Sequence, residues 1–175
     1  WIHPATDPGL VRVAGPKPPT SMLACGTAIA SAYLQPRIGS DIAVLKGLAK
    51  AVLAMGAEGA NFIASHAEGF AAFRTDLDAL SWDEITAASG LSREAIEAVA
   101  AIYARSQNVV FAWGMGMTHH LHGVANVEAI ANLALIRGMI GKRFAGLLPL
   151  RGNSNVPGIG TLGVYWWASP SHTDV

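Results

Sequence analysis

Residues 108–118 read NVVFAWGMGMT, and this stretch decides the fold class of the 175-residue chain. Residues 108–113 contain a short continuous apolar run at 109–112, which predicts a buried strand of a parallel sheet over 108–113. A helical pattern precedes the run, the glycine turn Gly114-Met115-Gly116 follows it, and a second helical pattern covers about residues 124–139. The order helix, strand, glycine turn, helix predicts an α/β fold, with a parallel sheet flanked by helices.

The rest of the chain is predicted to form helices joined by loops. Apolar residues at helical spacing follow Ser40 and Asp41, and Gly56 is the expected end of that helix. A capping-box pattern at 81–84 predicts a further helix that ends near Gly90. Ser92 is expected to cap another helix, whose one face carries Ile96, Val99, Ala100 and Tyr103. Residues 1–38 and 147–164 are rich in Gly and Pro and are expected to be loop, with a short strand at 10–13.

Composition excludes several classes of function. The 12 basic and 12 acidic residues balance, which argues against a nucleic-acid or acidic-membrane binder. The single cysteine, Cys25, excludes an internal disulfide or an all-cysteine metal site and is expected to be an inert buried thiol. The most apolar stretch, 124–141, carries Asn126, Glu128 and Arg137, so a buried helix is favoured over a membrane span. With 51% apolar residues and a mean hydropathy of +0.35, the chain is expected to be a piece of a longer protein that covers part of its surface.

Three features could carry chemistry. The turn at Gly114 lies where ligands bind in α/β sheets, although its glycines could equally serve a tight turn. Asp41 could contact a ligand, although helix capping explains it and is the favoured interpretation. His119, His120 and His122 could bind a metal, but one cofactor contact and two ordinary histidines are favoured, because adjacent histidines usually point in different directions.

The loop Arg151-Gly152-Asn153-Ser154-Asn155 combines a permanent cation with two amides. Such a set could hold an anionic substrate or cofactor through charge-assisted hydrogen bonds. An ordinary polar loop, closed by its own Asn side chains, explains the same residues equally well.

Several segments, in this order, together resemble one family. They read RIGSDIA (37–43), FIASHAEGF (62–70), WGMGMTH (113–119), NLALIRG (132–138), IGK (140–142) and GLLPLRGNSNV (146–156). This set is similar to the large subunit of molybdopterin-dependent oxidoreductases of the DMSO reductase superfamily, especially formate dehydrogenase alpha subunits. The resemblance runs from about residue 2 to residue 164.

The resemblance implies a Rossmann-like domain at 1–150, which binds bis-molybdopterin guanine dinucleotide carrying molybdenum or tungsten. Residues 151–175 would form an active-site loop and cross towards a second domain. The cofactor-binding residues it implies are Gly39, Ser40, Asp41, Gly114, Met115, Gly116, His119, Gly152, Asn153 and Asn155. Arg151 would be catalytic and would orient a small substrate such as formate. The resemblance further implies a 4Fe-4S cluster and the protein ligand of the metal upstream of Trp1, and contact with the remaining domains of the same protein. A cytoplasmic location is expected because no targeting signal is seen in the sequence.

Two other functions remain open from the sequence. His119, Asn153 and Pro157 depart from the family pattern, and no metal-ligand cysteine is present, so a non-redox nucleotide-binding or structural module of the same fold is an alternative. A hydrolase with a metal bound by the histidine cluster is a third hypothesis. The fragment alone is expected to be inactive.

Overall fold

The computed structural model describes residues 1–6, 8–13, 27–150 and 152. It begins with a short helix α1 (Pro8–Val11) and an antiparallel pair, β1 (Arg12–Val13) and β2 (Thr27–Ala28). The helices α3 (Asp41–Ala54), α4 (Ala60–His66), α5 (Phe70–Ala79), α6 (Trp82–Ser89) and α7 (Arg93–Arg105) follow. The chain then forms β3 (Val110–Trp113), α8 (Met115–Thr118), α9 (Gly123–Leu135) and β4 (Gly146–Pro149).

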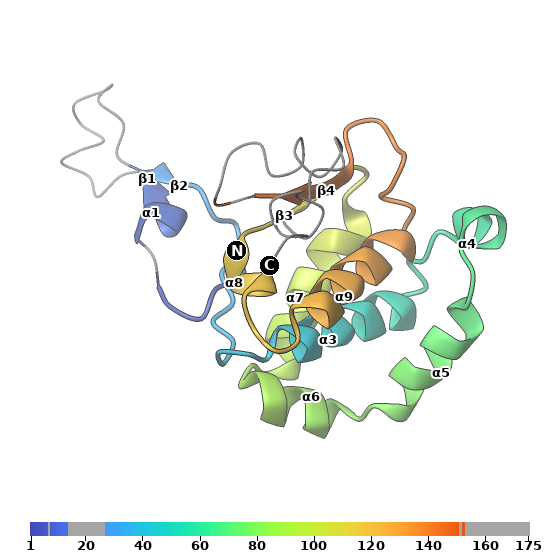
Figure 1. Cartoon of the computed structure of the whole chain (residues 1–175), viewed down its shortest axis with the longest axis horizontal. Helices are drawn as coiled ribbons and strands as arrows, with labels where there is room; N and C mark the ends of the chain where they lie inside the picture. The colour runs from blue at the N-terminus through green and yellow to red at the C-terminus, as the bar shows by residue number, and fades with distance from the viewer. Residues whose placement is uncertain (7, 14–26, 151, 153–175) are drawn as a thin grey trace, which may run out of the picture.

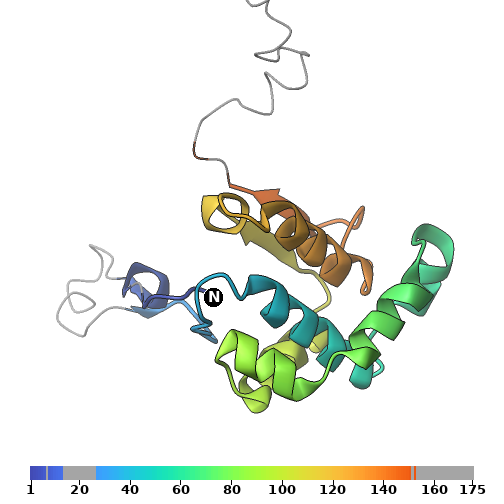
Figure 2. The ribbon, with the colours of Figure 1, turned by 60° about the horizontal axis from the view of Figure 1, so that its bottom comes forward.

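Helix α3 is the centre of the core. It packs against α7, α9 and α6, and Figures 1 and 2 show it between α9 and the α6–α7 pair. A Cβ at Gly47 would lie only 3.0 Å from Ile85 Cγ2 and 3.3 Å from Ile96 Cγ2, so glycine allows α3 to approach α6 and α7 closely. The buried aliphatic side chains of these helices form one continuous cluster.

Strands β3 and β4 form a small parallel sheet, so both carboxyl ends lie at the same edge. Val110 pairs with Gly146, and Trp113 pairs with Pro149. Phe111 and Leu147, which are paired with each other, pack on the helical core. The mixture of helices with a parallel sheet confirms the predicted α/β class.

The structure confirms several predicted helix ends. Ser81 and Glu84 form a complete capping box, and the helix they begin ends at Gly90, which has a left-handed φ of 71°. The Ser92 side chain accepts a hydrogen bond from the Ala95 amide and caps α7. Gly56, with a φ of 62°, follows the end of α3. None of the helices in the described ranges is long and apolar enough to cross a membrane.

Other predictions are wrong in part. The strand predicted at 108–113 is parallel but only half-buried, because Val110 on its outer face is 54% exposed. Residues 147–149, expected to be loop, belong to β4, because hydrogen bonding to β3 makes them a strand. Helix α9 ends at Leu135 rather than about 139, and Gly138 turns the chain with a φ of 63°. The strand predicted at 10–13 covers only Arg12–Val13, and α4 and α5 were not predicted.

Candidate functional site

The carboxyl ends of β3 and β4 bring two of the predicted site segments together. The Leu150 amide donates a 2.7 Å hydrogen bond to the Trp113 carbonyl and extends the pairing past the end of β4. A Cβ at Gly152 would lie 2.6 Å from Met115 Sδ, so Gly152 directly abuts the Met115 side chain. Residues nearly forty positions apart in sequence therefore meet at one edge of the sheet.

The glycine turn is open on its outer side. A Cβ at Gly114 or Gly116 would meet no atom of the described chain within 4 Å, and neither glycine has a positive φ. The backbone conformation therefore does not itself require glycine at either position. Open space above two glycines allows another molecule to approach the backbone closely. Helix α8 is a single turn and therefore has only a small dipole. A ligand would be favoured here by the open space above the two glycines.

Asp41 is the first residue of α3 and does not cap it. The N-cap is Ser40, which makes no side-chain capping bond, and its hydroxyl donates a 2.6 Å hydrogen bond to the Arg37 carbonyl instead. The favoured capping interpretation of Asp41 is therefore wrong. Its carboxylate faces the histidine cluster, with Oδ2 3.8 Å from His120 Nε2. Gly39 supplies the exposed turn before the helix, with a φ of 79°.

The three histidines do not converge. His120 is part-buried between Asp41 and Asn126, whereas His119 and His122 are exposed. The rings of His120 and His122 lie 6.5 Å apart and are nearly perpendicular. Within the described ranges, no three His, Cys, Asp or Glu side chains are grouped as a metal site would need, and the histidine-metal hydrolase has no geometric support.

Asn126 is the site residue that sequence reasoning missed. It is 1% exposed on α9, and its Nδ2 donates a 2.9 Å hydrogen bond to the Met117 carbonyl. The same nitrogen lies 2.6 Å from His120 Nε2. The signal was present in the sequence, since Asn126 is one of the few polar residues in a mostly apolar helix and follows Gly123 by three residues.

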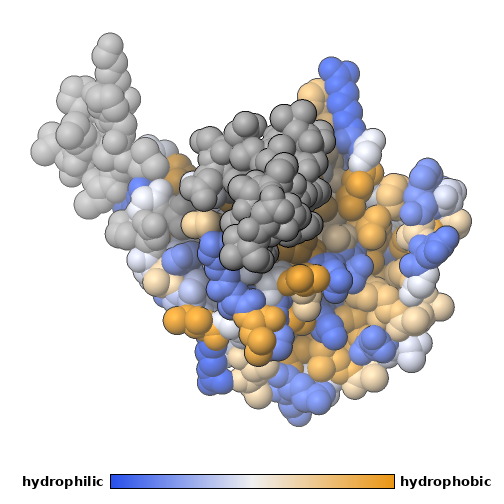
Figure 3. All heavy atoms as spheres, in the orientation of Figure 1, coloured by the Kyte–Doolittle hydropathy of each residue, from blue (hydrophilic) through white to orange (hydrophobic). Residues whose placement is uncertain are grey.

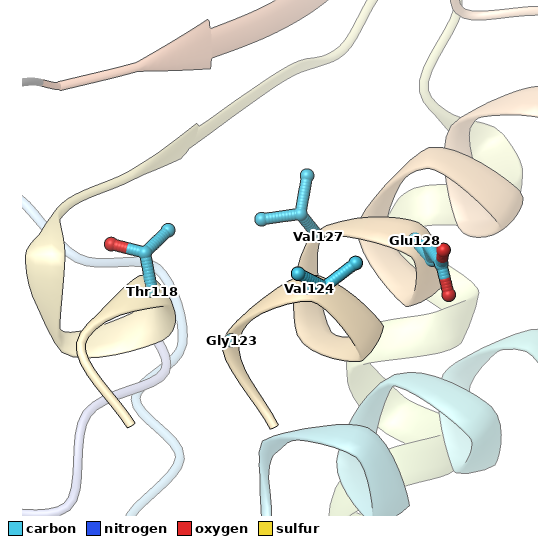
Figure 4. A pocket seen from close by; sticks show the side chains of 5 residues that line it. All are labelled: Thr118, Gly123, Val124, Val127 and Glu128. Carbon is cyan, nitrogen blue, oxygen red and sulfur yellow. The ribbon is translucent and has the colours of Figure 1, made fainter. Parts of the chain in front are cut away.

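A shallow pocket lies beside this network, between α8 and the start of α9. Thr118 lines one side of it, and Val124 and Val127 line the other, with Gly123 at its base and Glu128 farther along the helix (Figure 4). Val124 and the neighbouring Leu121 are 76% and 92% exposed. Figure 3 shows apolar side chains gathered on part of the face that it draws.

Some predicted residues lie outside the described part of the chain. They are Cys25, Arg151, Asn153, Asn155 and Pro157. The loop of residues 151–155 is thus represented by Gly152 alone, beside Met115. Within the described ranges, Gly152 lies beside the Gly114 turn. Asp41 lies close to the same turn because its carboxylate faces His120.

The chain is similar to known oxidoreductases over most of its length. No family model matches it. It is 40% identical over 174 residues to Protein YdeP of Escherichia coli K12, across 93% of this chain and 23% of that protein. It is 31% identical over 135 residues to formate dehydrogenase H of the same organism, across 77% of this chain and 19% of that protein. Further matching relatives carry the name oxidoreductase. These similarities support the identification of this chain as a molybdopterin oxidoreductase-like fragment.

A solved structure has a similar fold. Acetylene hydratase from Pelobacter acetylenicus matches with a TM-score of 0.63 and 17% sequence identity, across 66% of this chain and 16% of that one. The helices and parallel strands described above are therefore arranged as in part of that structure. The chain spans only 13–23% of the length of these curated relatives.

Proposed function

We propose that this chain forms part of the domain that binds bis-molybdopterin guanine dinucleotide in a molybdenum- or tungsten-dependent oxidoreductase. The observation that carries the proposal is the edge of the parallel sheet, where the Gly114–Gly116 turn, Gly152 and the Asp41–His120 pair lie in neighbouring positions. The carboxyl ends of parallel strands are the usual ligand-binding edge of an α/β sheet. The similarity to formate dehydrogenase H and other oxidoreductases supports a molybdopterin cofactor in particular.

The residues present fit such a group in shape and chemistry. The open space above Gly114 and Gly116 would admit a bulky planar ligand against the backbone. The Asp41 carboxylate is only partly buried and could accept hydrogen bonds from the amino and imino groups of a guanine or from a ribose hydroxyl. The exposed His119 imidazole makes no side-chain hydrogen bond to another described residue and could donate one to a phosphate or a pterin oxygen.

The bound cofactor would supply a centre that accepts or donates two electrons. The contribution of this chain would be binding and orientation. In the case of formate, oxidation to carbon dioxide releases two electrons and one proton, and Arg151 would hold the carboxylate in a fixed position by paired hydrogen bonds. Asn153 and Asn155 would complete the polar loop beside it.

The finer assignments belong to the same proposal. They comprise a Rossmann-like topology for residues 1–150, a crossing of 151–175 towards a second domain, a 4Fe-4S cluster elsewhere in the protein, and a cytoplasmic location. The sheet of β3 and β4 supports the Rossmann-like assignment because parallel pairing needs a crossover, and here α8 and α9 provide it.

Cofactor analysis of the full-length protein tests the proposal. The protein, purified under anaerobic conditions, should contain molybdenum or tungsten by mass spectrometry, a fluorescent oxidised pterin, and GMP after acid hydrolysis. Replacement of Gly116 by Val should reduce all three, because the side chain would occupy the open space above the turn. Ala64→Val, an exposed position on α4, is the matched control. Absence of both pterin and metal from the unmodified protein would refute the proposal.

A non-redox nucleotide-binding or structural module remains the second candidate. It is favoured by His119, which replaces the glutamine usual in the family, and by Pro157, which removes a backbone donor. The same preparation separates the two functions. A protein that releases a guanine nucleotide but holds no metal, and that reduces no dye with formate or other small substrates, would be a module of the second kind.

A further inference from the structure

Asn126 is a buried amide whose donors both face the candidate site. It is 1% exposed, and its Nδ2 contacts the Met117 carbonyl at 2.9 Å and His120 Nε2 at 2.6 Å. An amide nitrogen carries two hydrogens, so these two acceptors can satisfy it completely. A buried amide without partners would be costly, which makes both contacts part of the fold.

The contact with Met117 fixes the glycine turn to α9. Helix α8 is one turn long, and a helix this short has almost no stability of its own. Its backbone bonds include His119 N to the Met115 carbonyl at 2.8 Å. Helix α9, in contrast, is 13 residues long and packs on α3. Asn126 thus connects the single-turn helix α8 to a long helix that packs in the core.

The contact with His120 fixes the orientation of its ring. The Met117 carbonyl can only accept a hydrogen bond, so the amide must turn its nitrogen towards both partners. His120 Nε2 then faces the amide donor of Asn126, and His120 Nδ1 lies 3.4 Å from the His122 backbone amide on its other side. Asp41 from α3 faces the same Nε2 at 3.8 Å, beyond hydrogen-bond distance, and His122 is the neighbouring titratable group on the connecting loop.

We propose that Asn126 is a positioning residue for the cofactor site. It holds the Gly114–Thr118 turn at a constant place and orients the His120 ring beside Asp41, so that the turn and the start of α3 present one preformed surface. The link to a cofactor rests on the function proposed above. The positioning of the turn does not, and it can be measured without any cofactor.

Hydrogen exchange in the full-length protein tests the positioning. Asn126→Asp keeps the side-chain size but removes both donors. Amides of residues 115–120 should then exchange about tenfold faster, because the turn opens locally. Asn132→Asp is the matched control, since it makes the same change on the same helix away from the turn, and it should leave residues 115–120 unchanged. Cofactor content should fall about tenfold in Asn126→Asp only, the effect typical of losing a group that orients a ligand-binding side chain.

A second pair of variants separates hydrogen bonding from packing. Gln at position 120 can accept from Asn126 through Oε1 and donate towards Asp41, whereas Leu can do neither. His120→Gln should keep both the slow exchange and the cofactor, and His120→Leu should lose both. Adding His120→Leu to Asn126→Asp should cause little further change, because the two residues act through one contact.

The outcomes distinguish the two proposals. Equal exchange at 115–120 in the Asn126 and Asn132 variants, or equal behaviour of His120→Gln and His120→Leu, would overturn the positioning role. If Asn126→Asp speeds exchange throughout the molecule, including α7, the comparison of His120→Gln with His120→Leu alone tests the positioning role. If the unmodified protein holds no cofactor but the exchange pattern is as expected, the proposed function fails while the positioning role stands.

Discussion

Single residues set how closely segments approach one another around the glycine turn. Gly123 begins α9 directly against the end of α8, and its amide donates a 2.9 Å hydrogen bond to the His120 carbonyl. A Cβ at Gly123 would lie 2.2 Å from the Thr118 carbonyl oxygen, a distance that no pair of non-bonded atoms tolerates. The return of the chain from α8 into α9 therefore depends on glycine for space.

Gly123→Ala should lower the free energy of unfolding by about 3 kcal/mol, because backbone must move to admit the methyl group. Gly116→Ala is the control on the same turn. Its added methyl group meets no atom of the described residues within 4 Å and lies in a helix, so this variant should leave stability unchanged or raise it by up to about 1 kcal/mol. Urea unfolding of both variants checks the difference, and equal effects would contradict the close approach.

Tyr103 is a second single residue with a measurable effect, because it should make the protein less stable at alkaline pH. Burial raises the pKa of its phenol well above the ordinary value, against a smaller opposite effect of Arg137. Its hydroxyl donates a 2.7 Å hydrogen bond to the Leu133 carbonyl. The folded protein therefore keeps a proton that the unfolded chain releases above about pH 10, so stability is complete below that pH and falls as the pH rises.

Tyr103→Phe should cost about 1 kcal/mol at neutral pH, the usual value of one hydrogen bond. Its stability should then fall less steeply above about pH 10, because no phenol remains to titrate at this position. Urea unfolding between pH 7 and 11 measures both quantities. Parallel pH profiles for the two proteins would show that Tyr103 is not the group responsible.

At the scale of the element, the helices differ in how their ends are satisfied. Helix α6 has a reciprocal capping box, in which Glu84 Oε2 accepts from the Ser81 amide at 2.8 Å and from its hydroxyl at 2.7 Å. These hydrogen bonds lower the pKa of Glu84. Helices α3 and α9 have no side-chain cap, and both begin beside the candidate site. Local sequence therefore specifies α6, whereas α3 and α9 depend on packing.

Ser81→Ala should reduce stability by about 1 kcal/mol near neutral pH. The effect should shrink in acid, because the lowered pKa of Glu84 means that its stabilisation is present above about pH 4.5 and is lost as the pH falls through the folded-state pKa. Ser65→Ala, an exposed position on α4, is the control and should change little. Thermal unfolding at pH 7 and pH 3 compares them, and a cost that does not depend on pH would contradict the box.

At the scale of the whole molecule, one arginine joins three helix ends. Arg137 Nε donates a 3.0 Å hydrogen bond to the Ala57 carbonyl after α3, and Nη1 donates to the carbonyls of Tyr103 and Ser106 at the end of α7. The guanidinium also lies 5.0 Å from the centre of the Tyr103 ring. Arg137 follows α9, so its side chain holds α3, α7 and α9 together at the end of the core away from the glycine turn.

Arg137→Lys should lower stability by about 2–3 kcal/mol, because a single ammonium cannot bridge carbonyls on separate segments as the planar guanidinium does. Arg74→Lys is the control. Its ion pairs with Glu58 and Asp78 are long and on the surface, and such pairs contribute about 0–1 kcal/mol. Urea unfolding should rank the two variants clearly, and similar losses would show that Arg137 acts as an ordinary surface charge.

The sequence by itself determined the elements that local chemistry specifies. The capping residues Ser81 and Ser92 and the strand before Gly114 were all predicted, since caps, left-handed glycines and apolar runs act over a few residues. The resemblance to the molybdopterin family was also readable from ordered motifs and is confirmed by the relatives.

Only the tertiary structure decided what depends on distant partners. Residues 147–149 form a strand because β3 offers backbone donors and acceptors to them, and nothing local distinguishes them from a loop. Asp41 faces His120 rather than capping its helix, because α3 meets the α8–α9 loop at that point. Asn126 acquires its role only when α9 brings it beneath Met117. Spacing along the chain cannot encode such contacts, because each depends on how whole helices pack around the sheet.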